Sequence, residues 1–145
     1  MDLRTAAADD IEALFQLHCT VFRSHIETIW GWNDDWQLSN FNREFEAAVT
    51  EVILDEGIIV GFVQTIENSC RLYLHSIALS SVAQGQGIGT RLVKRLQQKA
   101  KGLGLPLELS VFRTNPRAME FYHRLGFRKT GETDSHTKMS WAAIE

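Results

Sequence analysis

The chain has few cysteines, little net charge and no long apolar run. Its two cysteines, Cys19 and Cys70, form no CxxC pair and join no histidine cluster, which argues against a zinc site and favours reduced, buried thiols. A single bridge between them remains an alternative. Because no stretch of eighteen apolar residues occurs, no membrane-spanning helix is expected. A net charge of −3 likewise gives no reason to expect nucleic acid or an anionic membrane as a partner.

Apolar side chains make up 44% of the 145 residues, without a compositional break. A chain of this length can bury one core but not two, so residues 1–145 are expected to form a single domain. The first residues, MDLRTAAADDIEAL, include acidic side chains where a signal peptide has a basic region. We therefore expect a soluble, cytoplasmic protein.

The N-terminal half is expected to contain one strand, two helices and three further strands. Asp9 followed three positions later by Glu12 is typical of a capping box at the start of the first helix. Asp34 or Asp35 is a candidate cap for the second. The apolar and β-branched spacings predict, in order, a strand at 2–6, helices from about 10 and over 36–49, a hairpin turning at 55–57 and a strand at 71–79.

The C-terminal half follows the order helix, strand, helix, strand, strand. Asn115 is expected to cap a short helix with Pro116 at its first position. The predicted elements are a helix from 88 to about 103, a strand at 107–112, the helix from 116 to about 125, and a hairpin of 128–133 with 137–141. The whole chain thus reads β-α-α-β-β-β-α-β-α-β-β, an α/β (α+β) protein with a mixed sheet.

The stretch SVAQGQGIGTRLV, residues 81–93, has three glycines within five positions directly before an amphipathic helix. Glycine lets backbone amides at a helix N-terminus approach an anion closely, and phosphate is the natural ligand of such a turn. A dinucleotide-binding GxGxxG motif needs glycine where Thr90 stands, and the Gly-Lys-Ser/Thr ending of a P-loop is absent. The sequence therefore predicts a phosphate site of another kind.

The turn fits the pattern Gln/Arg-x-x-Gly-x-Gly/Ala through Gln84, Gly87 and Gly89. Here the sequence resembles the GNAT N-acetyltransferase superfamily. NPRAMEFYHRLGF, residues 115–127, is similar to that family's Asn-x-x-Ala-x-x-x-Tyr-x-x-x-Gly-Phe element, so the resemblance covers residues 71–127. It implies a GNAT-like fold, acetyl-coenzyme A as cosubstrate, and direct acetyl transfer to a primary amine of a small molecule or peptide. Whether the chain forms a homodimer is left open.

The resemblance also implies positions for the cofactor. The strand before the turn pairs with the pantetheine arm through the backbones of Ile77 and Leu79, and Asn115 contacts the cofactor arm while capping its helix. Arg91, in the first turn of the helix, is a weaker candidate for the ribose phosphate end. The pyrophosphate is expected on Gln84, Gly85, Gln86, Gly87, Ile88, Gly89 and Thr90.

Two residues are candidates for proton transfer. Tyr122 stands where the family has the acid that protonates the coenzyme A sulfur, although it also lies on its helix's apolar stripe and fits a core role. His75 stands about where many members have a glutamate base, and an in-strand histidine is also commonly structural. The assignment of the base stays open, because Ser76 could orient a water and Glu108 lies in the adjoining strand.

HIETIWGWNDDWQ, residues 25–37, holds three of the four tryptophans. We expect Trp30 or Trp32 to face the acceptor, a cationic amine attracted by nearby acids, with anchoring of the two helices as the alternative.

No metal site is predicted. Two other functions compete with the transferase: a catalytically silent acyl-coenzyme A sensor of the same fold, and a dinucleotide-binding protein, which Thr90 and the hairpin-rich N-terminal half disfavour.

Overall fold

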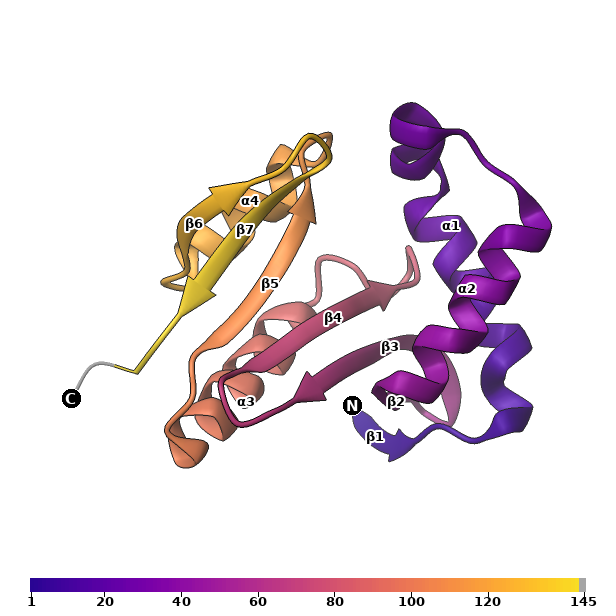
Figure 1. Cartoon of the computed structure of the whole chain (residues 1–145). Coiled ribbons are helices and arrows are strands. Elements are labelled where there is room, and N and C mark those ends of the chain that lie inside the picture. The colour runs from indigo at the N-terminus through magenta and orange to yellow at the C-terminus, as the bar shows by residue number, and fades with distance from the viewer. Residues whose placement is uncertain (144–145) are drawn as a thin grey trace. The chain divides into compact units, whose positions relative to one another are not determined.

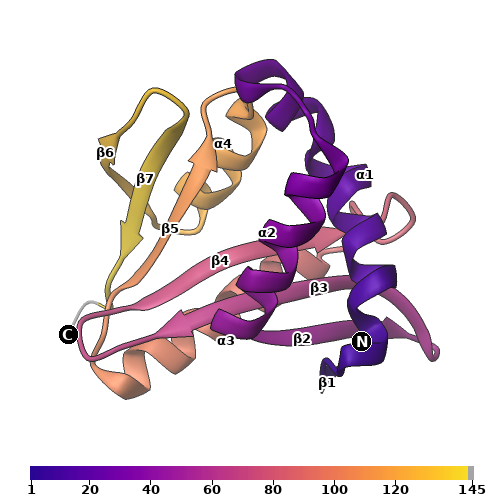
Figure 2. The ribbon, with the colours of Figure 1, turned by 45° about the vertical axis from the view of Figure 1, so that its right-hand side comes forward.

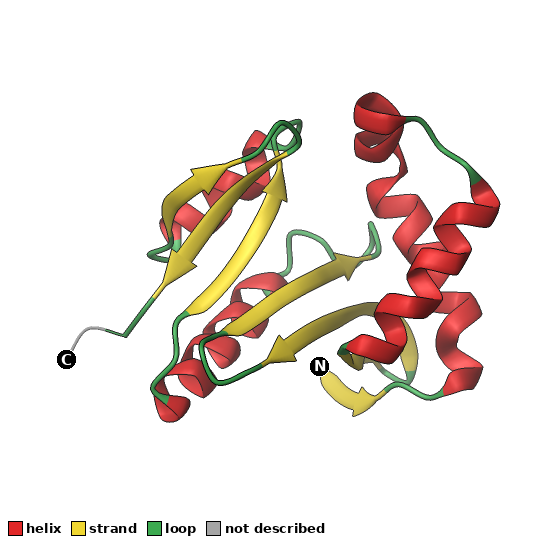
Figure 3. Ribbon diagram, in the orientation of Figure 1, coloured by secondary structure: helices red, strands yellow, loops and turns green. Residues whose placement is uncertain are grey.

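The computed structural model describes residues 1–143 and divides into two compact units (Figures 1 and 3). The N-terminal unit comprises Met1–Ile66 and His75–Ile88, and the C-terminal unit comprises Glu67–Leu74 and the residues from Gly89 onward. The strands follow the order β1-β2-β3-β4-β5-β7-β6, and β4 (Leu72–Leu79) passes from one unit into the other. The predicted order of strands and helices is confirmed, with one short 3₁₀ turn added before the first helix.

In the N-terminal unit, β1 (Asp2–Thr5), β2 (Val49–Asp55) and β3 (Ile58–Glu67) are antiparallel neighbours. The predicted hairpin is present, with Glu56 at φ 50° and Gly57 at φ 80° in a two-residue turn. The helices α1 (Ile11–Trp30) and α2 (Asp34–Ala47) lie side by side (Figure 2). Their apolar faces close a core of buried side chains from both helices and the sheet: Leu14, Phe41, Val52, Phe62 and Ala78.

The predicted capping box at Asp9 is wrong: Asp10 is the residue that precedes α1, and its side chain accepts from upstream groups rather than from amides of the helix. Both Asp10 carboxylate oxygens accept from the Arg4 guanidinium, at 2.7 and 2.9 Å, and Oδ2 also accepts from the Ala7 amide at 2.7 Å. The hydrogen bonds from Arg4 and Ala7 lower the pKa of Asp10 to about 2. Asp10 therefore ties β1 to the start of α1.

The cap of α2 also differs from the prediction. The Asn33 side chain accepts from the Trp36 amide at 2.8 Å, while Asp34 accepts from Trp32 Nε1 at 2.6 Å. Asn33 has the extended backbone of a cap, and Asp34 is already the first helical residue. The helix ends at Ala47, two residues earlier than expected, because Val49 begins β2.

The C-terminal unit contains α3 (Ile88–Leu103, with Ile88 at the unit boundary), β5 (Leu107–Phe112), α4 (Pro116–Arg124), β6 (Arg128–Glu132) and β7 (His136–Trp141). The start of β4 pairs in parallel with β5, and β7 pairs antiparallel with both β5 and β6. The Asn115 cap is confirmed, since its Oδ1 accepts from the Ala118 amide at 3.2 Å, with Pro116 at the start of α4.

Candidate active site

The glycine-rich turn connects the end of β4 to the start of α3. Gly85 and Gly87 have φ angles of +77° and +78°, which residues with a Cβ rarely adopt. Two glutamine side chains hold the turn: Gln84 Nε2 donates to the Leu79 carbonyl at 3.0 Å, and Gln86 Nε2 donates to the Val82 carbonyl at 2.7 Å. The Gln84 side chain thus stabilises the turn itself. The groups that the turn offers to a ligand are backbone amides.

The backbone amides of this turn suit a phosphate group. Gly85, Gln86 and Gly87 are exposed, and their amides donate to no acceptor within residues 1–143. A Cβ added at Gly85 or Gly87 meets no atom within 4 Å, so the space above the turn is open. The first amides of α3, from Ile88 onward, have no partner within the helix, and the helix dipole is positive at this end. The turn therefore fits the pyrophosphate that its sequence predicts.

Ser80, between β4 and the turn, has an unusual environment that sequence reasoning did not single out. Its amide donates to the Val60 carbonyl at 2.8 Å, but its buried Oγ has no hydrogen-bond partner in the described part of the chain. A buried hydroxyl is rarely left unsatisfied. The sequence offered no signal beyond the position of this serine next to the turn.

The start of β4 pairs with β5 within the C-terminal unit, where Leu72–Leu74 lie opposite Leu107–Leu109. Ile77 and Leu79 lie farther along β4, in the part that belongs to the N-terminal unit.

His75 is paired with a carboxylate that sequence reasoning did not select. Its Nε2 lies 2.9 Å from Glu44 Oε2 on α2, and Asn40 Nδ2 donates to Glu44 Oε1 at 2.9 Å. Burial raises the pKa of Glu44, but the hydrogen bond and charge of His75, with Asn40 and His18, outweigh it and lower the pKa overall. Glu44 is therefore an anion at neutral pH and orients the imidazole.

A second histidine, His18 on α1, lies near this pair among the rings of Phe15, Phe22 and Phe41, with centroids 5.3 to 6.1 Å away. Burial lowers the pKa of His18, although the charge of Glu44 opposes this shift. His18 is thus held mainly neutral.

Tyr122 lies in the C-terminal unit, near the end of α4, with only 6% of its surface exposed. Its ring packs against Phe121 and Phe127 at centroid distances of 5.1 and 5.4 Å, as a core residue would. Burial raises the pKa of its phenol, which keeps the hydroxyl protonated. Both the core role and the donor role considered from the sequence are compatible with this environment.

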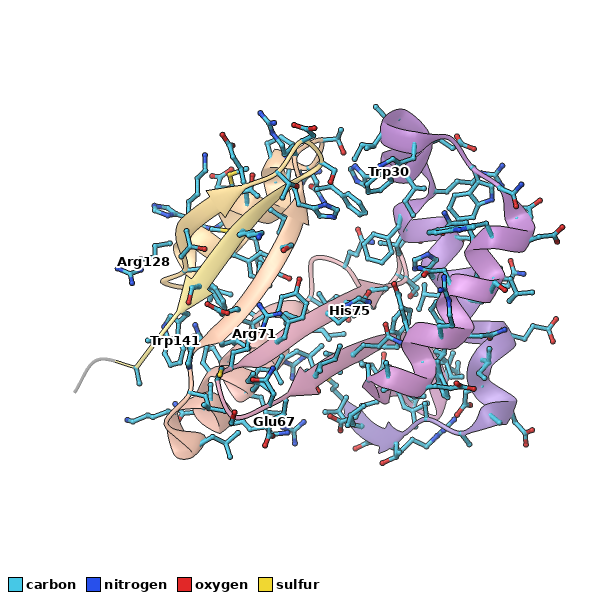
Figure 4. The ribbon with its side chains drawn as sticks, viewed as in Figure 1. Trp30, Glu67, Arg71, His75, Arg128 and Trp141 are labelled. Atoms are coloured by element: carbon cyan, nitrogen blue, oxygen red, sulfur yellow. The ribbon has the colours of Figure 1, made fainter. Side chains whose placement is uncertain are left out.

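The tryptophan segment spans the α1–α2 connection. Trp30, the last residue of α1, is 61% exposed (Figure 4). Trp32 is half-buried, donates from Nε1 to Asp34, and lies under the Arg23 guanidinium, whose carbon is 5.0 Å from the ring centroid. The two side chains therefore differ: Trp32 is fixed in the connection, whereas Trp30 presents its ring at the surface.

The remaining candidates have simpler surroundings. Glu108 forms an ion pair with Arg71 at 3.3 Å within the C-terminal unit, Ser76 is half-buried, and Arg91 is exposed. Cys19 and Cys70 are both free; Cys19 is half-buried and Cys70 is exposed, so the expectation of a buried thiol is wrong for Cys70. Residues 1–143 contain no group of three or more His, Cys, Asp or Glu placed to hold a metal ion, and no helix there is long and apolar enough to cross a membrane.

The chain is similar to known proteins in sequence and, separately, in fold. An uncharacterised N-acetyltransferase of Methanocaldococcus jannaschii is 30% identical over 141 residues, which cover 88% of this chain but only 60% of the relative. The N-alpha-acetyltransferase RimI of Mycobacterium tuberculosis is 27% identical over 116 residues, covering 76% of this chain and 72% of RimI. The crystal structure of the PaiA N-acetyltransferase of Thermoplasma acidophilum in complex with coenzyme A has a TM-score of 0.75 at 17% identity, with 98% of both chains covered.

The model of the Acetyltransferase (GNAT) family matches residues 11–127. The match includes α1 and α2, the glycine turn and α4, and it ends at Phe127 of the second motif. Because it spans most of the chain, the chain belongs to the GNAT acetyltransferase family.

Proposed function

We propose that this chain is an acetyl-coenzyme A dependent N-acetyltransferase that moves the acetyl group directly to a primary amine. The observation that carries the proposal is the glycine turn at the N-terminus of α3, whose exposed amides and positive φ angles suit a pyrophosphate. Membership of the GNAT family and the likeness to a coenzyme A complex support it. The fold of that neighbour by itself would not establish the activity.

The cofactor would be held mainly by backbone. The amides from Gly85 to Thr90 would bind the pyrophosphate, and the main chain of Ile77 and Leu79 would pair with the pantetheine arm. The orphan hydroxyl of Ser80 would gain a partner on the ligand. Asn115 uses Oδ1 to cap α4, which leaves its Nδ2 to donate to the cofactor arm.

The transfer needs one base and one acid. The acceptor nitrogen attacks the thioester carbonyl carbon, so that a C–N bond forms, the C–S bond breaks and the coenzyme A sulfur leaves as a thiolate. His75 would take the proton from the amine, directly or through a water that Ser76 orients, and Tyr122 would protonate the sulfur. Burial keeps the Tyr122 phenol protonated, as a donor requires.

Glu44 would act on the reaction through His75. A carboxylate only accepts hydrogen bonds, so a neutral His75 donates Nε2–H to Glu44 and carries its lone pair on Nδ1. Glu44 would thus fix the tautomer that takes a proton at Nδ1 and stabilise the imidazolium that results. This geometry favours His75 over Glu108 as the base, since Glu108 is already paired with Arg71.

The acceptor class would be a small-molecule or peptide amine. Trp30 offers an exposed ring to it, and Trp32 is the less accessible of the two. One relative in sequence is an N-alpha-acetyltransferase and one neighbour in fold is a spermidine N-acetyltransferase chimera, so the proposal keeps both kinds of amine.

The test combines binding with turnover. Calorimetric titration with coenzyme A is expected to show one site, and acetyl-coenzyme A with a panel of amines is expected to release thiol. Tight coenzyme A binding without thiol release from any amine would identify the chain as a sensor of the same fold. Absence of coenzyme A binding would reject the assignment of the glycine turn.

A further inference from the structure

A hollow of about 380 Å³ lies in the C-terminal unit, separate from the glycine turn. On β5, Leu107, Leu109 and Val111 are buried, so the intervening residues project from the opposite face of the sheet, where the hollow lies. Its polar lining comes from the start of β4 and from β5, β6 and β7: Arg71, Tyr73, Glu108, Ser110, Thr130 and Lys138.

Arg71, just before β4 (Figure 4), is fixed in this hollow by two neighbours. Its Nη1 lies 3.3 Å from Glu108 Oε1, and its guanidinium carbon lies 4.3 Å from the ring centroid of Tyr73. The Tyr73 hydroxyl in turn donates to Ser110 Oγ at 3.1 Å. Because a guanidinium has five N–H donors, the contact with Glu108 leaves donors for a second acceptor.

Lys138 brings a second cation to the same place. In the sheet, Lys138 lies directly opposite Ser110 on β5 and opposite Gly131 on β6. Because Gly131 has no side chain, it does not cover the side chain of Lys138. Within residues 1–143, no carboxylate oxygen lies within 4.0 Å of Lys138 Nζ. The hollow therefore holds two cations and one carboxylate, in a chain whose net charge is −3.

We propose that this hollow binds a carboxylate of the acceptor, so that the preferred acceptors are amines carrying an acid group near the amine; this inference rests on the function proposed above. Arg71 and Lys138 would supply the charge, and the hydroxyls of Ser110 and Thr130 would supply further donors. Tyr73, which lines the hollow, stands two positions before His75 on β4, so the same strand supplies the hollow and the candidate base.

The experiment uses two matched pairs of amines that differ only in a carboxylate or a carboxamide. One pair is β-alanine and β-alaninamide, and the other is the dipeptide amides Ala-Asp-NH₂ and Ala-Asn-NH₂. Each is titrated into the isotope-labelled full chain saturated with coenzyme A, while the amide resonances of Tyr73, Ser110 and Lys138 are followed. In at least one pair, the carboxylate member is expected to shift these resonances and bind roughly tenfold or more tightly than its carboxamide. Equal binding within both pairs, or no shift at these residues, overturns the proposal.

A pair of lysine variants completes the test. Lys138→Gln is expected to weaken binding of the preferred carboxylate about tenfold and to leave its carboxamide counterpart unchanged. Lys101→Gln, an exposed lysine in the last turn of α3, is the control and is expected to alter neither. Equal effects of the two substitutions also overturn the proposal. Since the resonance shifts require no turnover, the result is independent of whether acetyl transfer is detected, and the coenzyme A titration reports separately on the glycine turn.

Discussion

His75 Nε2 lies 2.9 Å from Glu44 Oε2, joining β4 to α2 within the N-terminal unit. The contact gives the candidate base a defined tautomer and an anionic hydrogen-bond partner. A histidine that serves only to fill the core needs neither. It is the relationship that most directly links the fold of this unit to proton transfer.

Glu44→Gln is expected to lower kcat roughly ten- to a hundredfold, with little change in the KM for acetyl-coenzyme A, because the variant loses the charge that orients His75. Glu46→Gln, an exposed residue on the same helix, is the control. A kcat in Glu44→Gln equal to that of Glu46→Gln would make Glu44 a structural residue.

Gly87→Val is expected to abolish or strongly weaken coenzyme A binding, because the side chain fills the open space above the turn and resists the φ of +78°. Gly57→Val is a matched control, since Gly57 has a φ of +80°, no atom within 4 Å of an added Cβ, and a place in the β2–β3 hairpin. Each variant should lose about 1 to 2 kcal/mol of stability through backbone strain. Calorimetry that gives both folded variants the same affinity for coenzyme A would contradict the phosphate assignment.

Tyr122→Phe is expected to slow the chemical step roughly a hundredfold while leaving cofactor affinity and folding nearly unchanged. Folding is preserved because the ring keeps its contacts with Phe121 and Phe127. Single-turnover kinetics and thermal unfolding measure the two effects separately. Because burial raises the pKa of Tyr122, any basic limb of the wild-type rate profile should persist in the variant. Wild-type turnover would leave Tyr122 as a core residue only.

Asp10→Asn is expected to lower the free energy of unfolding by about 1 to 2 kcal/mol at neutral pH, because the charged hydrogen bonds to Arg4 and Ala7 are weakened. The folded-state pKa of Asp10 is about 2, against an ordinary value of 3.8. Its contribution is therefore complete above the ordinary value and disappears as the pH falls through about 2. Urea unfolding across this range should show the wild-type and variant stabilities converging, and Asp9→Asn, at the exposed neighbouring residue, is the control variant.

Trp30→Ala is expected to raise the acceptor KM severalfold without loss of stability, because its ring is largely exposed. Trp32→Ala should instead destabilise the α1–α2 connection, through loss of its contacts with Asp34 and Arg23. Trp36→Ala, which removes a similarly exposed ring from α2, is the control. If Trp30→Ala and Trp36→Ala behave alike in acceptor kinetics, the acceptor binds elsewhere.

Features that depend on a few neighbouring residues were predictable from the sequence. The positive φ angles of Gly85 and Gly87, the Asn115 cap with Pro116 after it, and the Glu56–Gly57 hairpin turn each follow from local backbone sterics and hydrogen bonds. Which of two adjacent aspartates makes contacts at the start of α1 did not follow from the sequence. Asp9 and Asp10 have the same chemistry, and what distinguishes Asp10 is its contacts with Arg4 on β1 and with the Ala7 amide.

The pairings that give the candidate sites their chemistry depended on the tertiary structure. Glu44 and His75 are 31 positions apart, and Arg71 and Glu108 are 37 apart, so no local spacing relates them. Packing of α2 against the sheet brings the first pair together, and the parallel β4–β5 register brings the second. The sequence by itself determined the turn that suits a phosphate and the order of elements around it, because these are set by short-range sterics. Which charges face the candidate base and the polar hollow was decided only by the fold, because contacts between distant segments depend on how their apolar faces are buried together.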